Sequence, residues 1–509
     1  MSAAPPSTAT PSARPGIAYD SPQGRWVLAV AILASAVAML DATVVNVALP
    51  AIGRDLHAGF SGLQWTVNGY TLALGSLLLL GGSLGDRYGR RRMLVAGLAL
   101  FTAASLLCAL APSIGLLVAA RVLQGAGGAL LTPESLAIIT ASLRPEDRGR
   151  AIGAWSGTQG LASALGPLVG GWLVAAVSWR LIFVLNVPVA AFTAWAALRH
   201  VPESADAEAS GRPDVAGAVL AVAGLGGLVY ALIQAPGSGG GVGVVVAGAV
   251  GVVALAGFLA TERRARQPML PLSLFRDPQF SGANLATFAV YGGLGAAIFL
   301  IVLQLQETAR WSPVTAGAAL LPLTALMLLL SSRTGALAQR IGPRLPMTAG
   351  PLVAGLGLVL LAGIGRDARY LPDVLPGMVV LGLGLSLTVA PLTAAVLGAV
   401  EERHAGVASA VNNAVARIAG LLAVAVLPLV SGLATTTLGS AEYTAAYRRA
   451  MLIAAVVCAA GGVVALLTVR RGADVSAAPP APSLHHACHH PVGCLRPAAV
   501  VGGAEAPSR

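Results

Sequence analysis

The chain has 509 residues, of which 56% are hydrophobic and only 10% are charged, and its mean hydropathy is +0.78. A soluble domain carries roughly 25% charged residues, and a water-soluble fold has too little interior to bury this much apolar surface. The composition therefore excludes a soluble protein and predicts an all-α polytopic membrane protein. The net charge of +11 comes from arginines scattered through short turns, so we expect no nucleic-acid partner.

Apolar runs of about 20 residues, the length that crosses a bilayer, follow one another along most of the chain. The flanking residues 1–24 and 472–509 are rich in Pro and Ala and are expected to be disordered tails. We expect fourteen spans, near residues 26–48, 64–82, 93–111, 114–141, 151–177, 180–198, 214–234, 241–260, 280–304, 313–331, 346–365, 372–397, 406–430 and 449–469.

The distribution of arginine predicts the topology, because Arg-rich turns stay on the cytoplasmic side. Turns that follow even-numbered spans hold several arginines, as at residues 87–92 and 263–276, whereas the turns at 111–113 and 235–240 hold none. An even number of spans then places both termini in the cytoplasm. The high Arg and Ala content favours a bacterial host, and therefore the plasma membrane.

The turn after the second predicted span, residues 82–92, reads GSLGDRYGRRR and contains four arginines, one aspartate and three glycines. We expect it to be a short cytoplasmic hinge, because glycine suits sharp turns. A degraded copy, GALAQRIGPR at residues 335–344, begins 253 residues later. The offset predicts two six-helix bundles, at 25–200 and 268–471, separated by a linker at 201–267 with two extra spans.

Two charged residues lie inside apolar runs at similar depth. Asp41 is nine residues before Pro50, or about 13 Å from the outer end of the first span. Arg121 lies about eight residues, or about 12 Å, inside the fourth span, which runs the other way. A charge inside the membrane is costly and normally has a partner or a function. We therefore predict an ion pair, which either couples protonation to transport or only fixes the two helices.

The fifth predicted span contains a glycine-rich motif, with Gly166-Pro167 followed by Gly170-Gly171. Such a helix is thin and kinked, so it can bend or slide against a partner. The alternative is close glycine-mediated packing without any transport role.

In the fourth span, Gly125 and Gly128 follow Arg121 by four and seven residues and share its face. This motif, the 82–92 turn and the glycine motif of the fifth span together resemble motifs of the major facilitator superfamily. Three further stretches resemble the fourteen-span drug:proton antiporter family: residues 40–50 at the end of the first span, Trp65, Asn68 and Tyr70 in the second, and residues 179–188 at the start of the sixth. One departure is Ala162, which stands where that family usually has glycine. The resemblance covers about residues 25–470 and implies the major facilitator fold, alternating access between two bundles, and export of amphiphilic drugs in exchange for protons.

The resemblance and the polar positions within the apolar runs together give the expected site. Proton coupling and substrate contact are assigned to polar residues of the spans, namely Asp41, Arg121, Asn46, Gln124, Glu134, Tyr70, Asn186 and Arg417. Conformational gating is assigned to the two related turns, namely Gly82, Asp86, Arg87, Gly89, Arg90, Arg91, Gly335, Arg340 and Gly342. For Glu134 a solvated carboxylate at a helix end is the favoured interpretation, and for Arg417 a packing role is equally open.

The resemblance implies small amphiphilic substrates and protons as partners, the apolar spans imply the lipid bilayer, and we expect no cofactor. The cluster of His and Cys at residues 485–494 has ligand chemistry suited to zinc or copper, but a tail without a fold does not fix ligand geometry. We therefore expect no metal site. Two alternatives remain open, a facilitator or importer of one metabolite and a membrane sensor that does not transport. We expect no enzyme, because His-Glu-x-x-His is absent and the one Gly-x-Ser-x-Gly match, residues 81–85, overlaps the Arg-rich turn.

Overall fold

The computed structural model describes residues 16–205, 213–238, 241–265, 270–401 and 405–470. Fourteen helices in these ranges are long and apolar enough to cross a membrane, which confirms the predicted number of spans. Most of both predicted tails, including the His- and Cys-rich cluster, lies outside the described residues.

The first six spans begin and end close to the predicted positions. They are α1 (Pro22–Asp55), α2 (Phe60–Tyr88), α3 (Arg90–Ala109), α4 (Ile114–Ser142), α5 (Pro145–Ala176), and a sixth span made of α6 (Leu181–Val184) and α7 (Asn186–His200). Local sequence explains several helix starts. The Ser21 hydroxyl accepts from the Gly24 N–H and Pro22 occupies the first helical turn, and Ser113 caps α4 in the same way.

The other eight spans comprise the two-helix insert and the second half. The insert consists of α8 (Val215–Ser238) and α9 (Val242–Arg264). The second half consists of α10 (Pro278–Leu303), α11 (Pro313–Ala318) with α12 (Leu321–Ile341), α13 (Arg344–Leu361), α14 (Leu375–Leu397), α15 (Ala405–Ser431) and α16 (Ala441–Thr468). In the described ranges these helices make the protein all-α, as expected.

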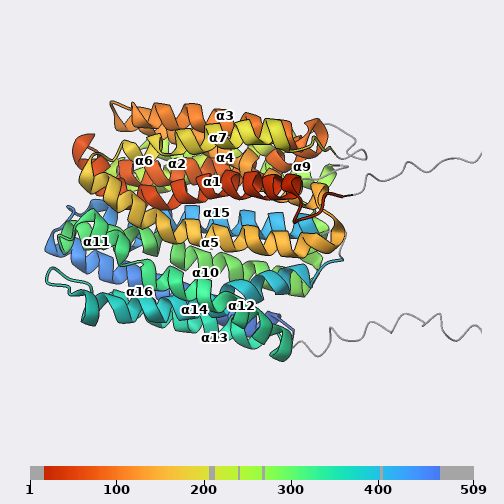
Figure 1. Ribbon diagram of the computed structural model, residues 1–509. Coiled ribbons are helices and arrows are strands. Elements are labelled where there is room, and N and C mark those ends of the chain that lie inside the picture. Colours follow the sequence, from red (N-terminus) through yellow and green to blue (C-terminus); the bar gives the residue numbers. More distant parts are fainter. Residues whose placement is uncertain (1–15, 206–212, 239–240, 266–269, 402–404, 471–509) are drawn as a thin grey trace, which may run out of the picture.

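The spans lie roughly parallel, and the two halves of the chain form two groups of helices (Figure 1). At their boundary, α2 packs against α15, and α5 packs against α11 and α12. Helix α8 of the insert covers the α2–α15 boundary through an apolar cluster that includes Leu72, Val229 and Leu421. The insert therefore contacts both halves along one side of the bundle.

We call the end of the bundle that carries the Arg-rich turns the inner end, and the opposite end the outer end. Polar contacts join the two halves in the outer part. Gln64 Nε2 donates to the Val424 carbonyl over 2.7 Å, and Gln306 Nε2 donates to the Val47 carbonyl over 2.9 Å. At the inner end, by contrast, α5 has free space on one face, because a Cβ added at Gly153 would meet no atom within 4 Å.

The predicted hinge at residues 82–92 is not a loop. Residues 82–88 form the last two turns of α2, and α3 begins at Arg90, so only Gly89 separates the helices. Gly89 has a φ of +106°, a conformation that favours glycine. The related turn ends the same way, since α12 runs to Ile341 and Gly342 has a φ of +83°. Among the glycines predicted to act in gating, only Gly89 and Gly342 therefore have a backbone conformation that requires glycine.

The expectation of disorder throughout residues 1–24 is wrong for the end of that segment. Ile17 exchanges backbone hydrogen bonds with Ser142 and Arg144 at the inner end of α4. The Tyr19 N–H donates to Asp147 Oδ2 over 2.9 Å, and α1 already begins at Pro22. These backbone bonds fix the entry to α1, which the composition of the segment does not reveal.

Candidate functional site

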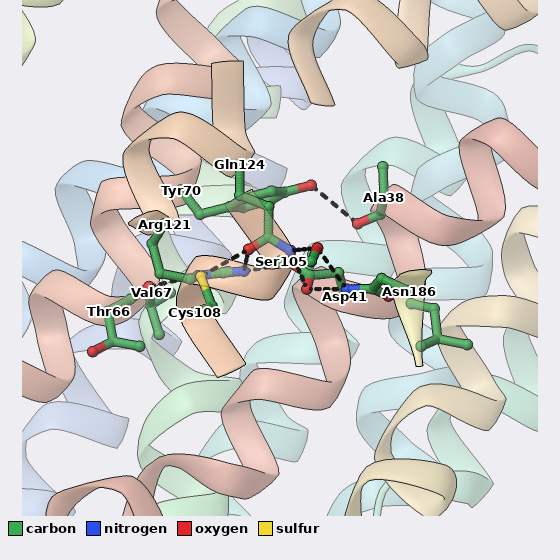
Figure 2. A network of polar contacts seen from close by, with 12 residues as sticks. Ala38, Asp41, Thr66, Val67, Tyr70, Ser105, Cys108, Arg121, Gln124 and Asn186 are labelled. Carbon is green, nitrogen blue, oxygen red and sulfur yellow. Dashed lines mark hydrogen bonds and ion pairs between the residues drawn. The ribbon is translucent and has the colours of Figure 1, made fainter. Parts of the chain in front are cut away.

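A buried ion pair between Asp41 of α1 and Arg121 of α4 forms the centre of the candidate site (Figure 2). Arg121 Nη1 donates to Asp41 Oδ2 over 2.5 Å, and the side chains of Asp41 and Arg121 are only 1% and 2% exposed. The two spans run in opposite directions and bring the charges to one depth. The predicted ion pair is therefore present.

Two amide side chains satisfy the rest of the Asp41 carboxylate, and a hydroxyl holds one of them. Gln124 Nε2 and Asn186 Nδ2 each donate to Asp41 Oδ1 over 2.9 Å. Gln124 Oε1 accepts from Arg121 Nη1 over 2.6 Å, and Gln124 Nε2 also donates to Ser105 Oγ over 2.8 Å. The network links α1, α3, α4 and α7, and it compensates charges that would be costly to bury alone.

A backbone carbonyl and an aromatic ring hold the other side of the Arg121 guanidinium. Arg121 Nε donates to the Thr66 carbonyl over 3.1 Å, and its guanidinium carbon lies 4.4 Å from the centroid of the Tyr70 ring. The Tyr70 hydroxyl donates to the Ala38 carbonyl over 3.1 Å, which fixes the ring (Figure 2). Tyr70, predicted to belong to the site, contacts the ion pair through its ring rather than its hydroxyl.

Asn46 and Glu134 are not part of this network. Asn46 Nδ2 donates to the Ala42 carbonyl of its own helix over 3.3 Å. Glu134 lies further towards the inner end of α4, where its residue is 1% exposed and packs against Gly85. Neither carboxylate oxygen of Glu134 has a hydrogen-bond partner among the described residues. The favoured interpretation of Glu134 as a solvated helix-end carboxylate is therefore wrong, because the α2–α4 contact buries it.

Arg417 lies in the other half, near the middle of α15, and faces α2. A Cβ added at Gly75 of α2 would lie 3.5 Å from the Arg417 Cβ. Five residues before Arg417, Asn412 Nδ2 donates to Asn284 and to Thr287 of α10 over 3.1 and 2.7 Å. The structure thus places Arg417 at the boundary between the halves and leaves Asn412 as a contact within its own half.

The glycine motif of α5 makes close contacts with helices of both halves. A Cβ added at Gly166 would lie 2.0 Å from Thr43 Oγ1 of α1, and one at Gly171 would lie 2.5 Å from the Pro313 carbonyl oxygen of the other half. On the facing helix α11, a Cβ at Gly317 would lie 2.2 Å from the Pro167 carbonyl oxygen. These glycines allow α5 to contact both halves at backbone distance.

The first gating turn is held within the N-terminal half. Arg90 Nη2 donates to Asp86 Oδ1 over 2.6 Å, and Arg91 Nε lies 3.6 Å from Glu203 Oε2, a partner that we did not predict. Arg87 instead lies over the Tyr88 ring, with its guanidinium carbon 5.7 Å from the ring centroid.

The remaining gating residues give a weaker copy of this turn. In the second half, Arg340 is exposed and Gly335 is helical, beside Ala390. In the first half, Gly82 lies in ordinary contact with Pro133. The two turns share a backbone conformation but differ in their polar contacts.

Sequence reasoning also missed Ser105 and Thr66. Ser105 accepts hydrogen bonds from two members of the network, and Thr66 contributes only its backbone carbonyl. A single serine in an apolar run carries no detectable signal, and any residue can supply a carbonyl. Among the described residues, no group of three or more His, Cys, Asp or Glu could hold a metal ion.

The spans, the repeated turns and the buried charge pair define a polytopic helical membrane protein built from two related halves. The profile described as "Major Facilitator Superfamily" matches residues 31–424, and the chain belongs to this superfamily.

Characterised relatives and solved structures agree with this assignment. The chain is 38% identical to "Multidrug resistance protein Stp" of Mycobacterium tuberculosis over 390 residues, which cover 76% of this chain and 72% of that protein. It is 36% identical to "Tetracenomycin C resistance and export protein" of Streptomyces glaucescens over 435 residues, which cover 83% and 79%. The crystal structure of a bacterial homolog of the human lysosomal transporter Spinster shares the fold, with a TM-score of 0.63, 18% identity and coverage of 88% and 97%.

Proposed function

We propose that the protein exports amphiphilic drugs or antibiotics in exchange for protons, by alternating access of a site between its two halves. The observation that carries this proposal is the Asp41–Arg121 ion pair, because a buried carboxylate paired with a buried arginine can exchange its partner for a proton. Relatives named for multidrug resistance and for tetracenomycin C export give the proposed direction and substrate class.

In this mechanism Asp41 is the proton-coupling residue and Arg121 responds to its charge. A proton on Asp41 removes the negative charge that pairs with Arg121 Nη1 and weakens the hydrogen bonds from Gln124 and Asn186. Because the network links four spans, its loss changes the contact of α1 with α4. Glu134, buried at the inner end of α4 without a partner among the described residues, is proposed as a second proton carrier.

Alternating access uses the contacts at the two ends of the bundle. Polar contacts join the halves in the outer part, and Gly153 of α5 has free space at the inner end, so we take the structure to represent an inward-open state. In this state Asp86 pairs with Arg90 of its own half. We propose that Asp86 and its neighbouring arginines contact the other half when the inner side closes, and that the glycines of α5 permit the movement.

The proposal places the protein in a bacterial plasma membrane with both termini in the cytoplasm. The Arg-rich turns at the inner end would then face the cytoplasm, where such turns are retained. Proposed partners are a small amphiphilic substrate, protons and the lipid bilayer.

Everted membrane vesicles test the proposal directly, because export then appears as uptake of the substrate. We expect wild-type vesicles energised by respiration to accumulate tetracenomycin C and to lose part of their pH gradient when it is added. An uncoupler should stop the accumulation, and Asp41→Asn should abolish it. The matched control is Asp55→Asn, which removes a carboxylate from an exposed ion pair with Arg180 of the same 2.5 Å length. Accumulation that persists in the uncoupler or in Asp41→Asn would contradict proton antiport through Asp41.

A further inference from the structure

We infer that Arg417 binds the anionic group of the exported molecule, so that the protein prefers amphiphilic organic anions to lipophilic cations. Arg417 is the one ionisable residue of α15 and lies twelve residues from its first residue, near the middle of the span. A charged residue in the membrane interior is costly and is a functional candidate by default. The inference rests on the proposed function, because it names the substrate class of the proposed site.

The Arg417 guanidinium has no compensating charge in the described structure. Arg417 Nε is buried without a hydrogen-bond partner, and no ion pair of Arg417 occurs among the described residues. The other central arginine, Arg121, is fully paired with Asp41. The middle of the described bundle therefore carries one excess positive charge, which a ligand anion can neutralise.

The surroundings of Arg417 suit the anionic end of an amphiphile. The side chain is partly exposed although it faces α2 at Gly75, and Asn413, one turn nearer the inner end, is exposed. Tyr291 of α10 packs against the apolar cluster that includes Val411 of α15, and Tyr70 lies on α2 five residues before Gly75. Aromatic and small side chains beside a guanidinium offer an apolar surface together with a fork of N–H donors for a carboxylate or phenolate.

The position also connects the substrate with the coupling network. Tyr70, which stacks on Arg121, lies on α2 five residues before Gly75, the residue that faces Arg417. An anion on Arg417 would therefore lie at the boundary of the two halves, next to the side chains that respond to Asp41. A permanent cation at the same place would be repelled by Arg417.

Binding of two fluorescent xanthenes of opposite charge tests the inference without any gradient. Purified protein in lipid nanodiscs is titrated with fluorescein, an organic anion, and with rhodamine 6G, a cation, and empty nanodiscs give the background. We expect wild type to bind fluorescein at least about tenfold more tightly than rhodamine 6G, because a hydrogen bond to a charged group contributes about that much. Arg417→Gln should weaken fluorescein binding by a similar factor and remove the preference, while Arg417→Lys should retain part of it.

Two controls keep the result specific. Arg276→Gln removes the same charge from an exposed residue before α10 and should change neither affinity. Monodisperse elution and an unchanged melting temperature of the Arg417 variants show that they are folded. If Arg417→Gln is not folded, the inference is judged from the dye binding of Arg417→Lys and from the dye preference of the wild type. Absent fluorescein binding, equal binding of the two dyes by wild type, or a preference that survives Arg417→Gln would overturn the inference. Failure of export with intact, Arg417-dependent fluorescein binding would instead count against the proposed function.

Discussion

The substitution Asp41→Asn should destabilise the protein far more than the same substitution in an exposed ion pair. An asparagine can keep its oxygen towards Gln124 and Asn186, but its NH₂ group then faces the Arg121 guanidinium, so a donor meets a donor at a 2.5 Å contact. Arg121 is left as a buried cation without a counterion. Removing one partner of a buried pair costs about 3–5 kcal/mol.

The Asp55–Arg180 pair provides the matched comparison, because its N···O distance is also 2.5 Å. Its side chains are 47% and 37% exposed, against 1% and 2% for Asp41 and Arg121. Exposed pairs contribute at most about 1 kcal/mol. Thermal unfolding of purified Asp41→Asn and Asp55→Asn in detergent measures the stability that each variant loses. Equal losses would refute the explanation that burial makes the Asp41–Arg121 pair the more important of the two.

The double variant Asp41→Asn/Arg121→Gln separates a structural role of the pair from a coupling role. Removing both charges should recover most of the lost stability, since no uncompensated charge remains. If the pair only fixes α1 against α4, export in vesicles should return with stability. If Asp41 carries the proton, the double variant should be stable and still fail to export. A double variant as unstable as the two single losses combined would contradict the electrostatic explanation.

Three further predictions concern helix contacts and the second buried carboxyl. Gly89→Ala should lower the free energy of unfolding by about 1–3 kcal/mol, because a φ of +106° is strained for alanine. The helical control Gly82→Ala should lower it less. Equal melting temperatures of the two variants would exclude strain at the turn. Gly171→Ala should slow export and speed the labelling of an engineered cysteine at the outer end, because the added methyl group collides with a backbone carbonyl of the other half. The control is Gly153→Ala, because the added methyl group has free space there. Unchanged labelling in Gly171→Ala would contradict the idea that the contact between Gly171 and Pro313 closes the outer end. Glu134→Gln should leave the melting temperature unchanged or raise it, because an amide of the same shape carries no charge to bury, yet should slow export; undiminished export would remove Glu134 from the proton path.

The spans and the central ion pair could be predicted because both follow from local rules. A helix in lipid satisfies its own backbone, so each span is recorded in about 20 consecutive apolar residues. The depth of Asp41 and of Arg121 follows from the fixed rise of a helix, and their high cost in lipid requires compensation. The offset between the two related turns predicts the position of the insert.

Other features depended on contacts that leave no trace in one stretch of sequence. Ser105 joins the network only because α3 packs beside α4 at that point, and a serine is common in any span. Glu134 looked solvated because it lies towards the inner part of its span, but Gly85 of α2 lets the helix approach and buries it. The glycines at 82 and 85 looked like turn residues, whereas both lie in α2 and face α4.

By itself, the sequence determined the fourteen spans, the repeat of two halves and the depth of the buried charges, because each depends on hydrophobicity and helical rise along a single segment. Only the tertiary structure decided which polar groups surround Asp41, that Glu134 is buried, and that Arg417 faces α2 without a partner among the described residues. These outcomes depend on how closely helices distant in the chain approach one another, and that distance is set jointly by the small residues on both of their faces.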